Sequence, residues 1–349
     1  MRREEIGEGT DCLSVCERSG KGTDSLTVAV RFHSCTPVWR AKVFPNLADI
    51  STVGDLYLES RLDFLRNTQN PDGGWGYFPG KQSWLEPTTY ATLALHGTPG
   101  ADAAFDGSWN LIRSWQTAEG SSRPSGQVEG GTWVTAHVVT LASVRGVYDD
   151  SVRRSVDWML SVVGVEHNLL MRAASLLHLL KSKLDVSHEG WPWREGNAAW
   201  IEPTAHTLVA LKKIAGHYKG GELAHRVRDG EALVLSRRCS DGGWNCGNPN
   251  VLDFDLPSYP ETTGLALLGL QGRSAVELRG PIDVARRFRE ETKSSLAKAW
   301  LTIALRCHGQ NVSAPASDGK APADVMLAAL EALGHPDGNY GLLRTEGRA

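Results

Sequence analysis

The chain has 349 residues, of which 37 are basic and 40 are acidic, so its formal net charge is −3. This balance offers no basic surface for nucleic acid, and the absence of a run of about 18 apolar residues argues against an integral membrane span. Because 41% of the residues are hydrophobic, the chain can bury a large core.

Residues 1–50 belong to no repeat and mix glycine, serine, threonine and charged residues, which predicts a poorly ordered extension before a folded region at 51–349. The first residues lack the apolar stretch of a secretory signal, so we expect a cytoplasmic protein. The cysteines are scattered without the paired spacings of a zinc site, and we predict free thiols, no metal and no cofactor. They are Cys12, Cys16, Cys35, Cys239, Cys246 and Cys307.

The first repeat begins with a predicted amphipathic helix, in which Leu58, Leu62 and Leu65 recur at i, i+4 and i+7. It runs into a Pro-Asp-Gly turn that ends Gly-Gly-Trp at 73–75. A second copy of this loop ends in the same way at 242–244, and weaker copies occur at 116–133 and 188–193. Self-similarity of this kind predicts a repeat architecture.

Each loop is followed by a second helix that is apolar or small on nearly all sides, as expected of a buried helix. Three of these helices share the opening aromatic-x-Glu-x-Thr, at 84–88, 200–204 and 259–263, and a fourth at 133–137 keeps the threonine but loses the glutamate. Glycine suits the left-handed position that closes a helix. We expect it to do so at Gly97, Gly146, Gly216 and Gly272, and at Gly309 and Gly334 after two further helices.

Outer amphipathic helices and inner apolar helices predict an all-α fold, an α/α-barrel or toroid of about six helical hairpins in two layers. Parallel inner helices would place their N-termini at one end of the barrel. Residues 151–163 and 168–181 both have helical patterns without a Gly-Trp loop between them, so the hairpin in the region 151–182 is not assigned.

The pattern Phe64-Leu65-x3-Gln69-x3-Gly73-Gly74-Trp75 resembles the QW motif of squalene-hopene cyclases and related class II terpene cyclases. The resemblance covers roughly residues 55–334 and extends to the β subunits of protein prenyltransferases. It implies the α/α-barrel but no single activity, because this barrel also occurs in thioester-containing complement domains and carbohydrate-active enzymes.

The Asp-x-Asp-Asp-Thr-Ala motif, with which class II cyclases protonate an alkene or epoxide, is absent. Aligned on the threonine, the family's proton-donor position falls on Glu86, Glu202 or Glu261, which are catalytic candidates by that comparison. A helix N-terminus stabilises a carboxylate by up to about 1 kcal/mol, which would make each a poorer acid. The alternative is that these side chains accept loop N–H groups or pair with an arginine.

Asp253 and Asp255 form a close acidic pair just before the helix start at Glu261. Carboxylates that share a concave site raise one pKa, so this pair is a further catalytic candidate; the alternative is a solvated turn. The stretch also resembles the zinc-binding Asp-x-Cys of prenyltransferase β subunits, with Asp255 in place of the cysteine. Since residues 321–327 also lack that family's later histidine, the resemblance does not imply zinc-dependent prenylation.

His137 and His206 occupy matching positions one turn into two inner helices. They could face a central cavity and bind a polar group or accept a proton, or they could be hydrogen-bonded core histidines. Tyr90, Trp133 and Tyr259 are candidate cavity walls, because aromatic faces stabilise carbocations; they could equally serve only in packing.

Together these features favour a terpene cyclase-like isomerase that binds an apolar isoprenoid in a central cavity, with protonation-initiated cyclisation. A non-catalytic barrel that binds a protein or a small molecule is the alternative, and contact with a membrane surface or a helical protein stays open. A carbohydrate-active enzyme using two of the carboxyl groups is a third hypothesis.

Overall fold

The computed structural model describes residues 47–167, 186–313 and 320–345, all of which belong to one compact unit, 45–349. Regular structure in these ranges is helical apart from one two-stranded sheet, which confirms the all-α prediction. The first helix begins at Leu47. The predicted extension at 1–50 therefore falls almost entirely outside the described residues, and its boundary stays a prediction.

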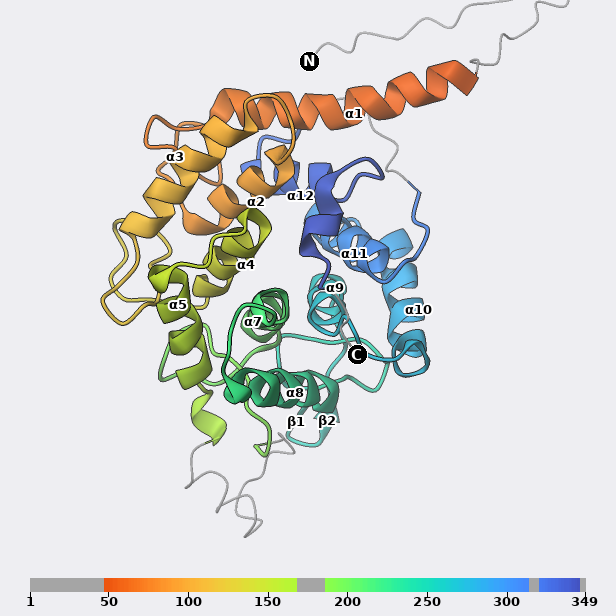
Figure 1. Ribbon diagram of the computed structural model, residues 1–349. Helices are drawn as coiled ribbons and strands as arrows, with labels where there is room; N and C mark the ends of the chain where they lie inside the picture. The colour runs from red at the N-terminus through yellow and green to blue at the C-terminus, as the bar shows by residue number, and fades with distance from the viewer. Residues whose placement is uncertain (1–46, 168–185, 314–319, 346–349) are drawn as a thin grey trace, which may run out of the picture. The chain divides into compact units, whose positions relative to one another are not determined.

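The inner layer is a closed ring in which each helix contacts the next, and the last contacts the first (Figure 1). This arrangement confirms the predicted toroid. In the described part of the chain the ring consists, in order, of α2 (Leu85–Leu95), α4 (Thr135–Arg145), α7 (Ile201–Ile214), α9 (Pro260–Gly269), α11 (Ser295–Cys307) and α12 (Val325–Leu333).

The outer layer covers this ring, with α3 packed on α2, α5 on α4, α8 on α7, and α10 on both α9 and α11. The long α1 packs on α12 and α2, so the first helix of the chain covers the joint where the ring closes (Figure 1). Their bounds are α1 (Leu47–Thr68), α3 (Ala101–Ser114), α5 (Asp150–Ser161), α8 (Gly221–Ser236) and α10 (Ala275–Glu291).

Three short elements lie in the connections: 3-10 helices at Val165–His167 and Asn339–Leu343, and a hairpin of β1 (Asn250–Val251) and β2 (Phe254–Asp255). Within the unassigned region 151–182, the first predicted helix is α5. The second, at 168–181, lies outside the described residues.

The Gly-Trp loops attach each inner helix to an outer one. Trp75 is fully buried, and its indole N–H donates to the carbonyl of Leu65 in α1 at 2.9 Å. Its backbone N–H donates to the hydroxyl of Thr88 in the first turn of α2, also at 2.9 Å. The same two bonds recur for Trp191, with Met159 and Thr204, and for Trp244, with Val234 and Thr263.

The loop and stop glycines are required by backbone geometry at most of the predicted positions. Gly73 has φ of +90°, and a Cβ there would lie 2.6 Å from the backbone of Gly107 in α3. The prediction of a left-handed stop is wrong at Gly216, which does not have a positive φ, and at Gly334, where φ is −74° because the chain continues in a right-handed turn. It is confirmed at Gly97, Gly146, Gly272 and Gly309.

The core occupies the space between the two layers and within the ring, and the predicted inner helices are buried on nearly all sides. Cys239, Cys246 and Cys307 are free thiols, as predicted for them. Among the residues that the structure describes, no helix combines the length and the apolar character that a membrane crossing needs.

Candidate active site

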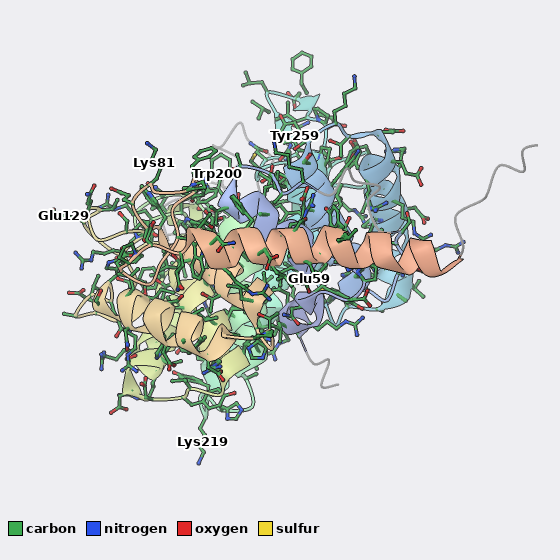
Figure 2. The ribbon with its side chains drawn as sticks, turned by 90° about the horizontal axis from the view of Figure 1, so that it is seen from above. Glu59, Lys81, Glu129, Trp200, Lys219 and Tyr259 are labelled. Carbon is green, nitrogen blue, oxygen red and sulfur yellow. The ribbon has the colours of Figure 1, made fainter. Side chains whose placement is uncertain are left out.

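The inner helices begin at one end of the barrel. Figure 2 shows Lys81, Glu129, Trp200 and Tyr259, which precede or cap the starts of α2, α4, α7 and α9, along the same side of the molecule. Lys219, which follows α7, lies on the opposite side. The predicted parallel arrangement therefore holds for these four helices, and their first turns lie at one end of the ring, which is called here the acidic mouth.

Three carboxyl groups meet in the acidic mouth. Glu86, Glu202 and Glu261 lie in the first turns of α2, α7 and α9, each two residues before a buried threonine, and each is partly exposed. Burial raises the pKa of Glu202 to about 8, with further contributions from the charges of Glu86 and Glu261. Burial also raises the pKa of Glu261.

Glu86 has the most elaborate surroundings of the three. Burial raises its pKa, the hydroxyl of Tyr77 opposes this by donating to its Oε2 at 2.6 Å, and the charges of Glu261 and Asp324 raise it further. Asp324 is the N-cap of α12, where its side chain accepts the N–H of Leu327 at 2.9 Å. Charges at neighbouring inner-helix starts therefore contribute to the raised pKa values of Glu86 and Glu202.

These shifts correct the expectation that the helix N-terminus keeps each glutamate ionised. The helix dipole is worth at most about 1 kcal/mol at such a site, which is less than one pKa unit. A pKa of about 8 at Glu202, against 4.5 for an ordinary glutamate, requires burial and mutual repulsion to dominate. At neutral pH the mouth therefore holds carboxylic acid, not only carboxylate.

One helical turn below the glutamates, aromatic and imidazole rings form a floor. Tyr90 and His206 are the i+4 neighbours of Glu86 and Glu202, and both are almost fully buried. The ring of Tyr90 lies edge-on to His137 and Trp300, with centroids 5.2 and 5.3 Å away.

The floor closes the ring axis at this level. His206 on α7 contacts His137 at 4.6 Å and Trp300 on α11 at 5.6 Å, between ring centroids. The helices α2, α7 and α11 are not neighbours in the ring. The contacts of Tyr90 on α2 and His206 on α7 with Trp300 on α11 therefore cross the centre of the ring. The ring of Trp133 contacts His137 and His206, with centroid distances of 4.9 and 5.3 Å. It also contacts Trp193, at 4.8 Å.

Both floor histidines are neutral. Burial lowers the pKa of His206 to about 3, and burial together with His206 lowers that of His137. Nδ1 of His206 lies 3.4 Å from the hydroxyl of Tyr90, whereas Nε2 of both histidines has no hydrogen-bond partner among the described residues. Neutral imidazole can accept a proton or a hydrogen bond from a group that enters the mouth.

Asp253 and Asp255 are placed differently from the glutamates. Both are exposed on the β1–β2 hairpin, whose two-residue turn has φ of 50° at Leu252 and 65° at Asp253. Asp255 accepts the side-chain amide of Asn250 at 2.9 Å. Neither Asp253 nor Asp255 is among the charges that shift the pKa values of Glu86 and Glu202, which come from other glutamates and, for Glu86, from Asp324. The structure therefore does not bring the hairpin aspartates into the glutamate cluster.

Tyr259 caps α9 and is 47% exposed at the rim of the mouth, whereas Tyr90 lies in the floor and Trp133 between the two levels.

Sequence reasoning missed Tyr77, Trp300 and Asp324. Tyr77 could have been found from its place two residues after the loop tryptophan. No repeat signal precedes Trp300, because α11 follows no Gly-Trp loop. In the described ranges, no cluster of three or more histidine, cysteine, aspartate or glutamate residues could hold a metal ion.

No protein-family model and no curated protein sequence matches this chain. Among solved structures it is similar to a glycosidase variant, with a TM-score of 0.51, 12% identity and coverage of 85% of this chain and 99% of that one. It is also similar to the type II terpene cyclase MstE from Scytonema, with a TM-score of 0.47, 17% identity and coverage of 75% and 73%. A protein from Actinoplanes has a TM-score of 0.49, 17% identity and coverage of 80% and 79%. At these identities the similarity shows the fold alone.

Proposed function

We propose that this protein is an acid catalyst of isoprenoid chemistry, in the manner of class II terpene cyclases, with Glu202 as the proton donor. The observation that carries the proposal is the group of three glutamates above an aromatic floor. In this group the pKa of Glu202 is about 8. A general acid works best when its pKa lies near the working pH, and a group with this pKa is largely protonated at neutrality.

The strength of this acid indicates the group that it protonates. A carboxylic acid with a pKa of about 8 is too weak to protonate an isolated alkene efficiently, but it can donate to an oxygen that is leaving carbon. We therefore infer an epoxide or an allylic oxygen on the isoprenoid. The proton moves from Glu202 to that oxygen, the C–O bond breaks, and the π electrons of a neighbouring alkene attack the carbon.

The other residues have supporting roles in this proposal. Burial keeps the proton on Glu202, and the charges of Glu86 and Glu261 add to this effect. The faces of Trp133 and Tyr259 at the mouth, with Tyr90 below, stabilise the positive charge that moves along the isoprenoid. The last cation loses a proton to form an alkene, and the neutral imidazole of His206 or His137 accepts it.

One observation favours the alternative, a barrel that binds without catalysis. The axis below the mouth is filled by Tyr90, His137, His206 and Trp300, so a long isoprenoid has little depth to enter at this level. In this reading the acidic mouth recognises a partner molecule through its carboxyl groups and rim aromatics.

An activity assay separates the two. Purified protein is incubated with epoxides of farnesol, geranylgeraniol and squalene, and products are identified by gas chromatography with mass spectrometry; aryl glycosides serve as a comparison substrate class. We expect cyclised isoprenoid, a loss of about 100-fold or more in kcat for Glu202→Gln, and no loss for the exposed Asp255→Asn. Activity should also fall as pH rises through 8, when Glu202 ionises. Absence of any product, or equal rates in both variants, would refute the proposal.

A further inference from the structure

A buried ion pair lies next to the start of α7. Glu166 belongs to the 3-10 helix at Val165–His167, Arg237 is the C-cap of α8, and both are at most 3% exposed. Nη2 of Arg237 donates to Oε1 of Glu166 at 2.7 Å. Taking two charges out of water costs free energy, and well-packed apolar side chains of similar volume are often at least as stable. Stability alone therefore does not explain why this pair is present.

Both members of the pair hold the backbone of Ala199. The N–H of Ala199 donates to the two carboxylate oxygens of Glu166, at 3.0 Å each, and its carbonyl accepts Nη1 of Arg237. Ala199 immediately precedes Trp200, the N-cap of α7, and Glu202 follows in the first turn of that helix. The ion pair thus fixes the chain at the point where it enters α7.

The equivalent starts of α2 and α9 are held in a different way. Ser83 and Ser258 occupy the position of Ala199, five residues before the threonine that accepts a loop N–H. The hydroxyl of Ser83 donates to Asp72 at 2.8 Å, and that of Ser258 donates to Asp241 at 2.9 Å. Each aspartate lies three residues before its loop tryptophan. A side-chain bond within the repeat therefore ties each of these two starts to its own loop.

This bond is not possible at the start of α7. Ala199 has no hydroxyl, and His188 stands where the other two loops carry aspartate. Glu166 accepts the backbone N–H of Ala199, as Asp241 accepts that of Ser258 at 3.1 Å. The carboxylate that holds α7 thus comes from outside the repeat loop, and because it is buried it requires the arginine as a partner.

We propose that Glu166 and Arg237 are positioning residues, which hold the start of α7 and with it the carboxyl group of Glu202 in the acidic mouth. Without the pair, the first turn of α7 is less firmly held and water reaches the carboxyl group more easily. Hydration stabilises the carboxylate, so the pKa of Glu202 falls toward its ordinary value. The consequence for catalysis rests on the proposed function, whereas the positioning itself does not.

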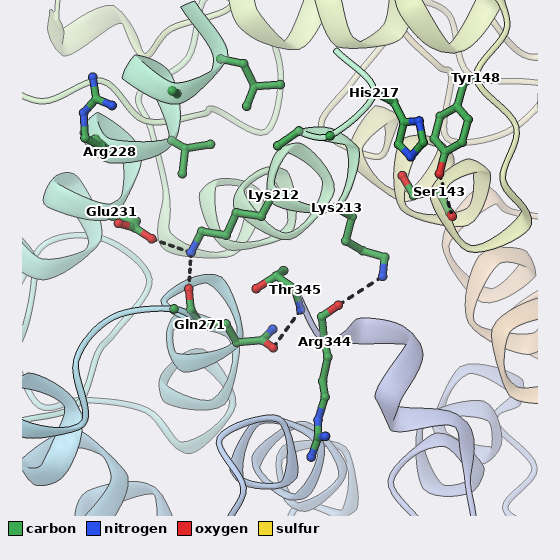
Figure 3. Close-up of a pocket in the computed structure, with 16 residues that line it drawn as sticks. Ser143, Tyr148, Lys212, Lys213, His217, Arg228, Glu231, Gln271, Arg344 and Thr345 are labelled. Atoms are coloured by element: carbon green, nitrogen blue, oxygen red, sulfur yellow. Dashed lines mark hydrogen bonds and ion pairs between the residues drawn. The ribbon is translucent and has the colours of Figure 1, made fainter. Parts of the chain in front are cut away.

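A second buried ion pair, at the other end of the same helix, provides a matched control. Lys212 in the last turn of α7 lies 2.5 Å from Glu231 of α8, as Figure 3 shows. Its ammonium also donates to the carbonyls of Gly269 and Gln271, at 2.7 and 2.6 Å. Lys212→Met therefore removes a largely buried cation from α7 without acting on the start of the helix.

The pKa of Glu202, measured by NMR, tests the inference. The full chain is labelled with ¹³C at the glutamate carboxyl carbons, and the signal of Glu202 is identified by its loss in Glu202→Gln. The informative variants are Arg237→Met and the double variant Glu166→Leu/Arg237→Met, which leaves no unpaired charge in the interior. The charges that act on Glu202, those of Glu86 and Glu261, are unchanged in both.

We expect the pKa of Glu202 to be at least about one unit lower in both pair variants than in the wild type, a ten-fold change in acid strength, and unchanged in Lys212→Met. Equal pKa values in the wild type and the double variant would overturn the inference. An equal fall in Lys212→Met would also overturn it, because any loosening of α7 would then suffice. Retained folding of each variant is checked by circular dichroism.

Activity reports on the proposed function separately. If the wild type cyclises isoprenoid epoxides, the pH at which kcat falls should be lower in the double variant by the same shift as the pKa. If the wild type forms no product while the pKa still falls in the pair variants, the positioning stands and the proposed function fails. Cyclisation with the same pH profile in the wild type and the double variant would refute the positioning alone.

Discussion

Replacing Glu202 by glutamine should change how the stability of the protein depends on pH. The pKa of Glu202 is about 8 in the folded protein and 4.5 for an ordinary glutamate. Below pH 4.5 both states are protonated; between 4.5 and 8 the unfolded chain releases a proton that the folded state keeps, so stability falls as pH rises. At 1.36 kcal/mol per pKa unit, the difference corresponds to roughly 5 kcal/mol lost by pH 8. Glutamine has the shape of the neutral acid and no proton to lose.

We therefore expect Glu202→Gln to equal the wild type in stability near pH 5 and to exceed it by several kcal/mol at pH 8. Urea unfolding at pH 5, 6, 7 and 8 measures this difference as a change in the slope of the unfolding free energy with pH. Glu129→Gln is the matched control, because Glu129 is exposed at the same end of the barrel (Figure 2). If the wild type and Glu202→Gln lose stability in parallel between pH 5 and 8, the account of the acidic mouth is wrong.

Three further substitutions test the floor and the loops. His206→Phe should reduce the loss of stability that the wild type shows as pH falls below 6.5, because His206 has a pKa of about 3 in the folded protein and the unfolded chain therefore takes up the proton first. The free energy of unfolding, measured between pH 3 and 7, would show this difference. An unchanged dependence on pH in the variant would contradict it. Gly120 has φ of +99°, and a Cβ added there would lie 2.4 Å from the backbone of Arg154 in α5, whereas Gly100 has φ of +80° and no atom within 4 Å of such a Cβ. Gly120→Ala should therefore lower the free energy of unfolding in urea by at least about 2 kcal/mol more than Gly100→Ala does. Trp244→Phe should cost about 2–4 kcal/mol, because it empties core volume and removes the indole N–H that donates to the carbonyl of Val234 at 2.6 Å. A thermal shift of less than one degree would argue against this account.

The acidic mouth could be predicted because the repeat fixes its register. Thr88, Thr204 and Thr263 each accept the backbone N–H of a loop tryptophan, so the same bond sets the start of three inner helices. Residues at equal offsets from these threonines must then occupy equivalent positions on the ring. Aligning the glutamates in the sequence was therefore equivalent to placing them in space, although their protonation state depended on burial, which the alignment does not contain.

Tyr90, His137 and His206 could be singled out from the sequence, but their closure into a floor by Trp300 could not be predicted, because it depends on how the ring closes. The contacts of Trp300 with Tyr90 and His206 join helices that are distant in sequence and not adjacent in the ring. Their existence depends on ring diameter and on side-chain direction, neither of which a repeat pattern specifies. Asp253 and Asp255 illustrate the converse: they are close in sequence, but a tight turn directs their hairpin outward into solvent.

Differences among equivalent positions give the mouth its polarity. Where α2, α7 and α9 carry a glutamate, α4 carries Trp133, so the ring of equivalent positions holds three carboxyl groups and one indole. Since α4 contacts both α2 and α7, the position of Trp133 in the ring comes between those of Glu86 and Glu202. In the proposed reaction, Glu202 gives up its proton, and the new carboxylate and the indole face would both attract the cation that forms. A fully symmetric ring of four acids would repel its own ionised form and offer no aromatic face, so the proposed chemistry makes use of the tryptophan that replaces glutamate in one repeat.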